Sequence, residues 1–136
     1  MKGIRSCVLA ASLAISIGGA ASAQEFVIGV SGAITGPTAS TYAPTVEAMR
    51  IYFDRVNRLG GINGRKVKFI ALDDQGEPSR GAANARRLVA QENVNVLVGA
   101  GPSATNAPLM TESERSGTPL VFAGSVCPNE SYPPAK

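Results

Sequence analysis

The sequence predicts an α/β domain built on an open, doubly wound parallel sheet with helices on both faces. Short runs of branched apolar residues alternate with longer segments whose apolar residues recur every three or four positions. Glycine, proline or small polar residues mark each boundary between the two kinds of segment. Strands that alternate with helices in this way pair in parallel and carry the helices on the two faces of the sheet.

The first strand is expected over residues 26–30, which are short, branched and bounded by small residues. A loop rich in Gly, Pro, Ser and Thr follows over residues 31–43 and leads into a helix over residues 44–59. Gly60 and Gly61 end this helix, because glycine accepts the left-handed conformation of a helix cap. The apolar stripe of the helix consists of Val46, Met49, Phe53 and Val56.

The second strand is expected over residues 67–72, after a turn signal at Asn63 and Gly64. Pro78 suits the first turn of a second helix, which we expect to reach Gln91.

Two more strands and one more helix complete the β-α-β-α-β-α-β order. Residues 94–98 and 119–123 predict strands, and residues 104–115 predict the helix between them. A glycine-rich loop over residues 99–103 joins the third strand to this helix, and each crossover should be right-handed.

The first 23 residues have the composition of a secretory signal peptide. Cationic residues, an apolar stretch over residues 7–17 and small residues from Ala21 to Ala23 follow in the required order. The apolar stretch is shorter than the roughly 20 residues of a membrane span. We expect cleavage between Ala23 and Gln24, with no cysteine there to accept a lipid, and a mature chain in the periplasm.

Composition argues against nucleic acid, metal and enzymatic chemistry. Removing the two basic residues of the leader leaves 11 of the 13 basic residues against 10 acidic ones. A nearly neutral chain with 5% aromatic residues offers neither a phosphate-binding field nor a stacking platform. The sequence contains no histidine, which removes His-based metal sites and His-based acid–base catalysis. We expect no cofactor and no metal in this protein.

The loop after the third strand is the most informative candidate site, because ligands of open parallel sheets bind beyond the carboxyl ends of strands. Gly99 and Gly101 allow close approach of a ligand to the backbone. Ser103 and Thr105 place hydroxyls at the start of a helix, whose free N–H groups favour a carboxylate or phosphate. Ser103 could equally cap its own helix, and both roles can hold at once.

Several short motifs also occur in a specific order along residues 26–125. They are Ile28-Gly29-Val30, Thr35-Gly36-Pro37, Tyr42, the run Gly60 to Arg65, Asp73-Asp74, Pro78, Ala82, Ala83, Ala85, Leu88 and Val98-Gly99. In this combination the chain resembles the type 1 periplasmic solute-binding proteins of the leucine/isoleucine/valine-binding family. The resemblance implies a monomeric, non-catalytic binder with two hinged lobes, which captures a small carboxylate-bearing solute for the membrane permease of an ABC importer.

The resemblance also implies which residues hold the solute. These are Tyr42 in the first loop, Ser103, Ala104 and Thr105 after the third strand, and Gly124 and Ser125, with Val126 beside them, after the fourth. Ala104 and Val126 lack the hydroxyls that the family often has at these positions. This departure counts against a free α-amino acid and is compatible with an aromatic carboxylate or another small organic acid. The expected solute class covers branched-chain or other amino acids, amides and aromatic acids.

Residues 24–136 correspond to the N-terminal lobe of such a protein. They number 113, too few for two lobes, so we expect a fragment that binds solute weakly by itself. Cys127 is the one cysteine outside the leader. Its partner could lie in absent sequence, or it could be a free thiol or a buried apolar residue.

Three other interpretations are open at this point. Gly99 to Ala104 fit a dinucleotide fingerprint, but no acidic residue occurs over residues 120–126, where that fingerprint requires one. Asp73 and Asp74 could form an acid–base or metal pair, yet adjacent residues on extended backbone point in opposite directions. We expect them to cap loops. A ligand-sensing receptor domain would share this fold.

Overall fold

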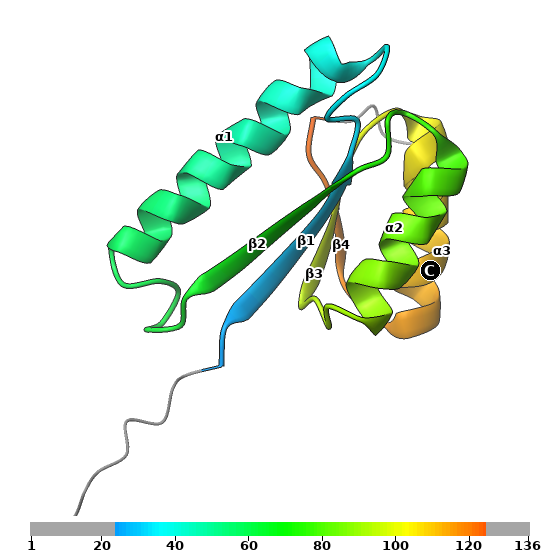
Figure 1. Cartoon of the computed structure of the whole chain (residues 1–136). Coiled ribbons are helices and arrows are strands. Elements are labelled where there is room, and N and C mark those ends of the chain that lie inside the picture. Colours follow the sequence, from blue (N-terminus) through cyan, green and yellow to red (C-terminus); the bar gives the residue numbers. More distant parts are fainter. Residues whose placement is uncertain (1–23, 125–136) are drawn as a thin grey trace, which may run out of the picture.

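The computed structural model describes residues 24–124, in which a four-stranded parallel sheet is flanked by three helices (Figure 1). The strands are β1 (Phe26–Gly32), β2 (Val67–Asp73), β3 (Val96–Ala100) and β4 (Leu120–Phe122). The helices are α1 (Ala39–Arg58), α2 (Pro78–Ala90) and α3 (Ser103–Ser116). The predicted fold class and element order are therefore confirmed.

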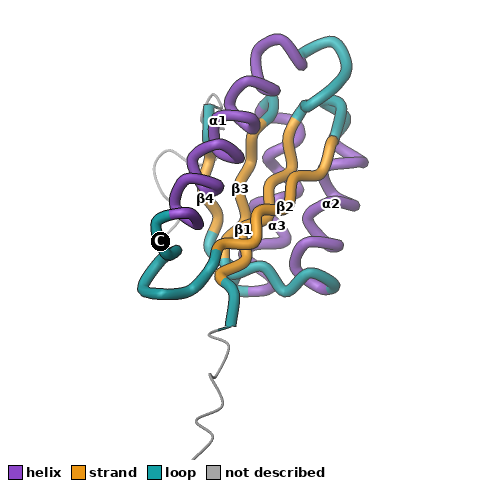
Figure 2. The backbone as a smooth tube through the Cα atoms, turned by 60° about the vertical axis from the view of Figure 1, so that its left-hand side comes forward, coloured by secondary structure: helices purple, strands orange, loops and turns teal. Residues whose placement is uncertain are grey.

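The strands lie in the order β2-β1-β3-β4, and every neighbouring pair is parallel. The chain runs from β1 outward to β2 and then crosses back past β1 to β3. This reversal places α1 on one face of the sheet and α2 with α3 on the other, as Figures 1 and 2 show from two sides. The direction changes between β1 and β3, which is where open α/β sheets bind their ligands.

A hydrophobic cluster lies on each face of the sheet. The cluster on the α1 face consists of Ile28, Val30, Val46, Val67, Val98 and Ala100. The cluster on the opposite face consists of Leu88, Val94 and Leu97. Gly29 belongs to this second face, where a Cβ would lie 2.6 Å from the Val94 side chain and 2.8 Å from Leu88. The absence of a side chain there allows α2 to pack directly on the sheet.

The first helix begins at Ala39 and not at Pro44 as predicted. The amides of Thr41 and Tyr42 donate to the carbonyl of Thr38, at 3.0 and 3.3 Å, so the helical turn forms ahead of the proline. Proline removes one N–H donor and does not prevent a turn from forming before it. Pro108 occupies the same position in α3, the sixth residue of its helix.

The third strand covers Val96–Ala100, two residues later than predicted. Asn95 explains the shift, because both its backbone and its side chain form hydrogen bonds with Val27 near the start of β1. Its amide donates to the carbonyl of Val27, and its Oδ1 accepts from the amide of Val27, both at 2.8 Å. Val94 then belongs to the preceding loop and packs with Leu88.

The predicted turn at Asn63 and Gly64 is confirmed. Both residues have positive φ, 49° and 78°, and Ile62 and Arg65 exchange backbone hydrogen bonds of 2.8 and 2.9 Å across it. Gly60, with φ of 108°, follows the last residues of α1 as expected for a glycine cap.

Candidate functional site

The loops that follow the strands gather at one edge of the sheet, drawn at the top in Figure 1. Gly32 at the end of β1 is in register with Ala100 at the end of β3. The amide of Ala33 donates to the carbonyl of Ala100 at 3.1 Å, so the loop after β1 and the turn after β3 leave the sheet together. The predicted site after β3 therefore lies at the point where the sheet reverses direction.

Ser103, Ala104 and Thr105 form the first turn of α3, but they differ in exposure. Ser103 is partly buried, Ala104 is exposed, and Thr105 is completely buried. The hydroxyl and the amide of Thr105 both bond to the carbonyl of Pro102 at 2.9 Å. Pro102 is the N-cap residue of α3, so the alternative that Ser103 occupies the N-cap is wrong. Ser103 and Ala104 are the two residues of this turn that reach the surface.

Tyr42 and Gly124 lie farther along the same edge of the sheet. Tyr42 is in the first turns of α1 and only 9% exposed, so the surrounding protein covers most of its ring. Gly124 is exposed and has φ of 70°, and a Cβ on it would lie 2.9 Å from the hydroxyl of Thr45 in α1. Gln24 is exposed at the start of the described chain. Ala23, Ser125, Val126 and Cys127 lie outside the described residues.

Asp73 ties together two of the loops at this edge. Its Oδ1 accepts hydrogen bonds from the amides of Ile34, Thr35 and Gln75, at 3.0, 3.1 and 3.0 Å. Its Oδ2 accepts a short hydrogen bond from the hydroxyl of Thr35. Partial burial works to raise the pKa of Asp73, but the hydrogen bonds together outweigh burial and hold that pKa below its ordinary value.

Asp74 points the other way, into the protein, and is completely buried. Its carboxylate accepts from the hydroxyl of Ser31 and from the amide of Gly76, both at 2.9 Å. Asn84 of α2 donates in turn to the hydroxyl of Ser31 at 3.2 Å. Burial raises the pKa of Asp74, and the nearby charge of Asp73 adds to this rise, against the two hydrogen bonds. The predicted capping role of this pair is confirmed.

Asn106 is a buried polar residue that sequence patterns did not single out. It is 1% exposed, and its Nδ2 donates to the carbonyl of Gly101 at 3.1 Å. A Cβ at Gly99 would lie 2.4 Å from Asn106 Oδ1, and one at Gly101 would lie 2.5 Å from Thr105 Oγ1. Gly99 and Gly101 were expected to leave room for a solute. The absence of side chains at these two positions also allows α3 to pack close to the sheet.

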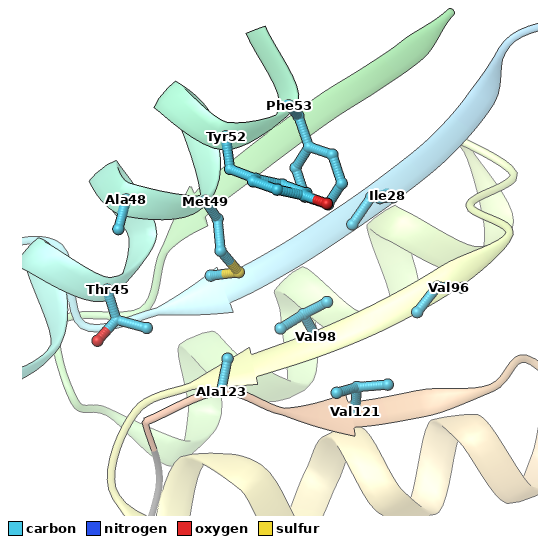
Figure 3. A pocket seen from close by; sticks show the side chains of 10 residues that line it. All are labelled: Ile28, Thr45, Ala48, Met49, Tyr52, Phe53, Val96, Val98, Val121 and Ala123. Carbon is cyan, nitrogen blue, oxygen red and sulfur yellow. The ribbon is translucent and has the colours of Figure 1, made fainter. Parts of the chain in front are cut away.

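A separate apolar groove of about 470 Å³ lies between α1 and the strands β3 and β4 (Figure 3). Its lining is Ile28, Thr45, Ala48, Met49, Tyr52, Phe53, Val96, Val98, Val121 and Ala123. The hydroxyls of Thr45 and Tyr52 are the two side-chain hydrogen-bond donors of this lining, and Tyr52 is 61% exposed. The lining contains no cationic side chain that could neutralise a carboxylate, and it includes none of the predicted site residues.

Residues 24–124 contain neither a metal-binding cluster nor a helix that could span a membrane. No group of three or more His, Cys, Asp or Glu side chains in this part of the chain is placed to hold a metal ion. Of the helices between these residues, none has the length and apolar character that a membrane span requires.

The fold and its carboxyl edge define an α/β lobe of the class that binds small molecules beyond its strand ends. Residues 25–135 match the family described as periplasmic binding protein, and the chain belongs to this family. Its relatives show that it is the type 1, leucine/isoleucine/valine-binding-like branch, which confirms the resemblance found in the sequence motifs.

Two relatives and two solved structures illustrate the similarity. An "Amino acid binding protein" of Pseudomonas aeruginosa is 32% identical over 127 residues, 93% of this chain and 33% of the relative. The "Leucine-specific-binding protein" of Salmonella typhimurium is 24% identical over 128 residues, 94% of this chain and 34% of the relative.

Among solved structures, the branched-chain amino acid transporter substrate-binding protein LivJ of Streptococcus pneumoniae, in complex with isoleucine, superposes with a TM-score of 0.67. It is 25% identical, and the match covers 72% of this chain and 28% of that protein. A type 1 periplasmic binding protein of Bordetella pertussis superposes with a TM-score of 0.69 at 26% identity, over 82% of this chain and 30% of that protein.

Membership in this family settles the choice between an enzyme and a binding protein. The family consists of binding proteins and not of enzymes, which confirms the non-catalytic prediction and overturns the dinucleotide-enzyme interpretation of Gly99 to Ala104. The chain spans about a third of the length of the curated relatives that it matches.

Proposed function

We propose that residues 24–136 form the N-terminal lobe of a periplasmic solute-binding protein that feeds an ABC importer. The solute is a small organic acid, either an amino acid or another carboxylate. In this proposal residues 1–23 are the leader that directs the chain to the periplasm. The complete binder is a monomer that closes two lobes around the solute and then docks on the membrane permease.

One observation supports this proposal above the others: α3 begins at the carboxyl edge beside the point where the sheet reverses. The first turn of α3 contains no acidic residue. The N-terminal amides and the positive end of the helix dipole therefore face no negative side chain on their own helix, and they favour a carboxylate. Ser103 supplies a hydroxyl at this turn, and the exposure of Ala104 leaves room beside it.

The chemistry of the solute is inferred from relatives and from this turn together. The relative from Pseudomonas aeruginosa is named an amino acid binding protein, and the pneumococcal structure holds isoleucine. Ala104 cannot donate a side-chain hydrogen bond to an α-amino acid. We therefore include aromatic and other small carboxylates in the proposed substrate class.

The proposal is tested by titrating the chain, exported with its own leader and purified from a bacterial periplasm, with L-isoleucine and with benzoate. Amide resonances of Ser103 and Ala104 should shift during the titration. Ser103→Ala should weaken binding about tenfold, because a buried ligand oxygen loses a hydrogen-bond partner.

Ser79→Ala is the matched control, since Ser79 lies in the first turn of α2 and is exposed. It should leave the affinity unchanged. An unaltered affinity in Ser103→Ala, together with a lowered melting temperature, would leave Ser103 a purely structural residue and contradict the proposed site.

A further inference from the structure

The loop between β1 and α1 projects from the same edge as the start of α3. Thr35, Gly36 and Pro37 at its tip are exposed. Ala33 at its base is anchored to β3 through the carbonyl of Ala100. The contacts that fix the tip therefore set the distance between this loop and the first turn of α3.

The Asp73 carboxylate fixes this tip. It accepts the amides of Ile34 and Thr35 as well as the hydroxyl of Thr35, so two consecutive loop residues are held by one side chain. Gly36 follows with φ of 90°, and a Cβ on it would lie 2.9 Å from the carbonyl oxygen of Gln75. The tip thus rests directly on the turn that follows β2.

The turn that carries Asp73 also lies against the start of α3. A Cβ at Gly76 would lie 3.1 Å from Thr38 Oγ1 and 4.0 Å from Pro102 Cγ. Asp74, on the same turn, lies beneath Gly101, whose added Cβ would be 3.5 Å from the nearer carboxylate oxygen. One short turn is therefore in contact with both segments that border the proposed solute site.

We propose that Asp73 is a positioning residue of the solute site, which holds residues 34–37 as a preformed wall opposite the first turn of α3. This inference rests on the proposed function. The carboxylate does not itself bind solute, because its lone pairs are directed at the loop and at Gln75. Without the Asp73 carboxylate, residues 34–37 become ordered only when solute binds. The free-energy cost of ordering them then weakens binding.

The test compares Asp73→Ala with Asp73→Asn in the exported chain. Alanine removes every acceptor, whereas the Oδ1 of asparagine can still accept the same three amides. Asp73→Ala should speed hydrogen exchange of the Ile34 and Thr35 amides and weaken L-isoleucine or benzoate binding about fivefold, the cost of ordering a loop upon binding. Asp73→Asn should restore most of the exchange protection and most of the affinity.

Asp54→Ala is the charge-matched control, since Asp54 is exposed on α1 and its loss also removes one negative charge. It should change neither exchange nor affinity. Unchanged protection of Ile34 and Thr35 in Asp73→Ala would overturn the proposal whether or not solute binds. Equal affinity of wild type and Asp73→Ala would overturn it as well. Absence of any shift at Ser103 and Ala104 in the wild type would instead count against the proposed function.

Discussion

Asp73 and Asp74 are neighbours in the chain, yet their carboxylates meet opposite environments. Asp73 accepts four hydrogen bonds at the edge of the sheet, and its pKa is lowered. Asp74 is enclosed beneath Gly101, and its pKa is raised by burial. Extended backbone sends adjacent side chains to opposite faces, so one sequence dipeptide yields two electrostatic roles.

These opposite shifts predict opposite pH dependences for Asp73→Asn and Asp74→Asn. Ionised Asp73 stabilises the fold above its ordinary pKa of 3.8, and this stabilisation disappears as pH falls through the lowered pKa of the folded state. Asp73→Asn should therefore cost about 1 kcal/mol at neutral pH, and the deficit should shrink in acid. Asp74 titrates above 3.8 in the folded state, so wild type should gain stability relative to Asp74→Asn as pH falls through that raised pKa.

Urea unfolding of the wild type and both variants between neutral and acidic pH measures these differences. The informative quantity is the free energy of unfolding of each variant relative to the wild type at each pH. If the two differences ran parallel with pH, the environments assigned to the two carboxylates would be wrong.

At this scale the sequence predicted the divergence of the two aspartates but not their partners. The capping role followed from local geometry, whereas the pairing of Asp73 with Thr35 depends on the register of Gly32 with Asp73 across β1 and β2. Likewise, the complete burial of Thr105 and Asn106 depends on how α3 packs on β3. Such contacts join residues far apart in sequence, and periodicity carries no information about them.

The strands and helices themselves were predictable because their apolar periods are strong. The errors fall at the ends, and each has an identifiable cause. Pro44 suits a first turn by its fixed φ, but α1 starts five residues earlier because Thr38 accepts two amides ahead of it. The proposed solute-binding turn was placed within one residue of the true start of α3, because glycine and proline precede it.

The contact between α2 and α3 yields a prediction at the scale of elements. Gly81 is buried in α2, and a Cβ on it would lie 2.8 Å from the carbonyl oxygen of Thr105. Because that atom is backbone, α2 must move away from α3 to admit a methyl group. Gly81→Ala should therefore destabilise the fold by about 1–3 kcal/mol, despite the higher helix propensity of alanine.

Ala83→Gly on the exposed side of α2 is the companion variant. It should cost about 1 kcal/mol through helix propensity alone. Thermal or urea unfolding measures both variants, and both should be less stable than wild type. A stabilised Gly81→Ala would show that propensity decides the outcome and that the two helices are not in close contact.

At the scale of the whole molecule, the two faces of the sheet are covered unequally. The α2 and α3 helices lie side by side on one face, whereas α1 alone lies on the other (Figure 1). The apolar groove lies beside α1, along β3 and β4 (Figure 3). Val121 on this face is 52% exposed. The strand order that produces this asymmetry was not predictable from the sequence, because the same element order fits more than one arrangement of four strands.

The final prediction concerns how much of a solute this chain can hold. A small-molecule site encloses about 70–90% of its ligand, and in the proposed site the turn at Ser103 and the loop at Asp73 belong to one lobe only. The chain, exported with its own leader, should therefore bind L-isoleucine or benzoate with a Kd of about 1 mM or weaker, which corresponds to about −4 kcal/mol. Isothermal titration calorimetry measures the heat of binding and hence the Kd. The amide shifts of Ser103 and Ala104 report binding that is too weak for calorimetry to detect. A submicromolar Kd would show that this chain encloses its solute unaided, and the proposal of an opposing second lobe would then fail.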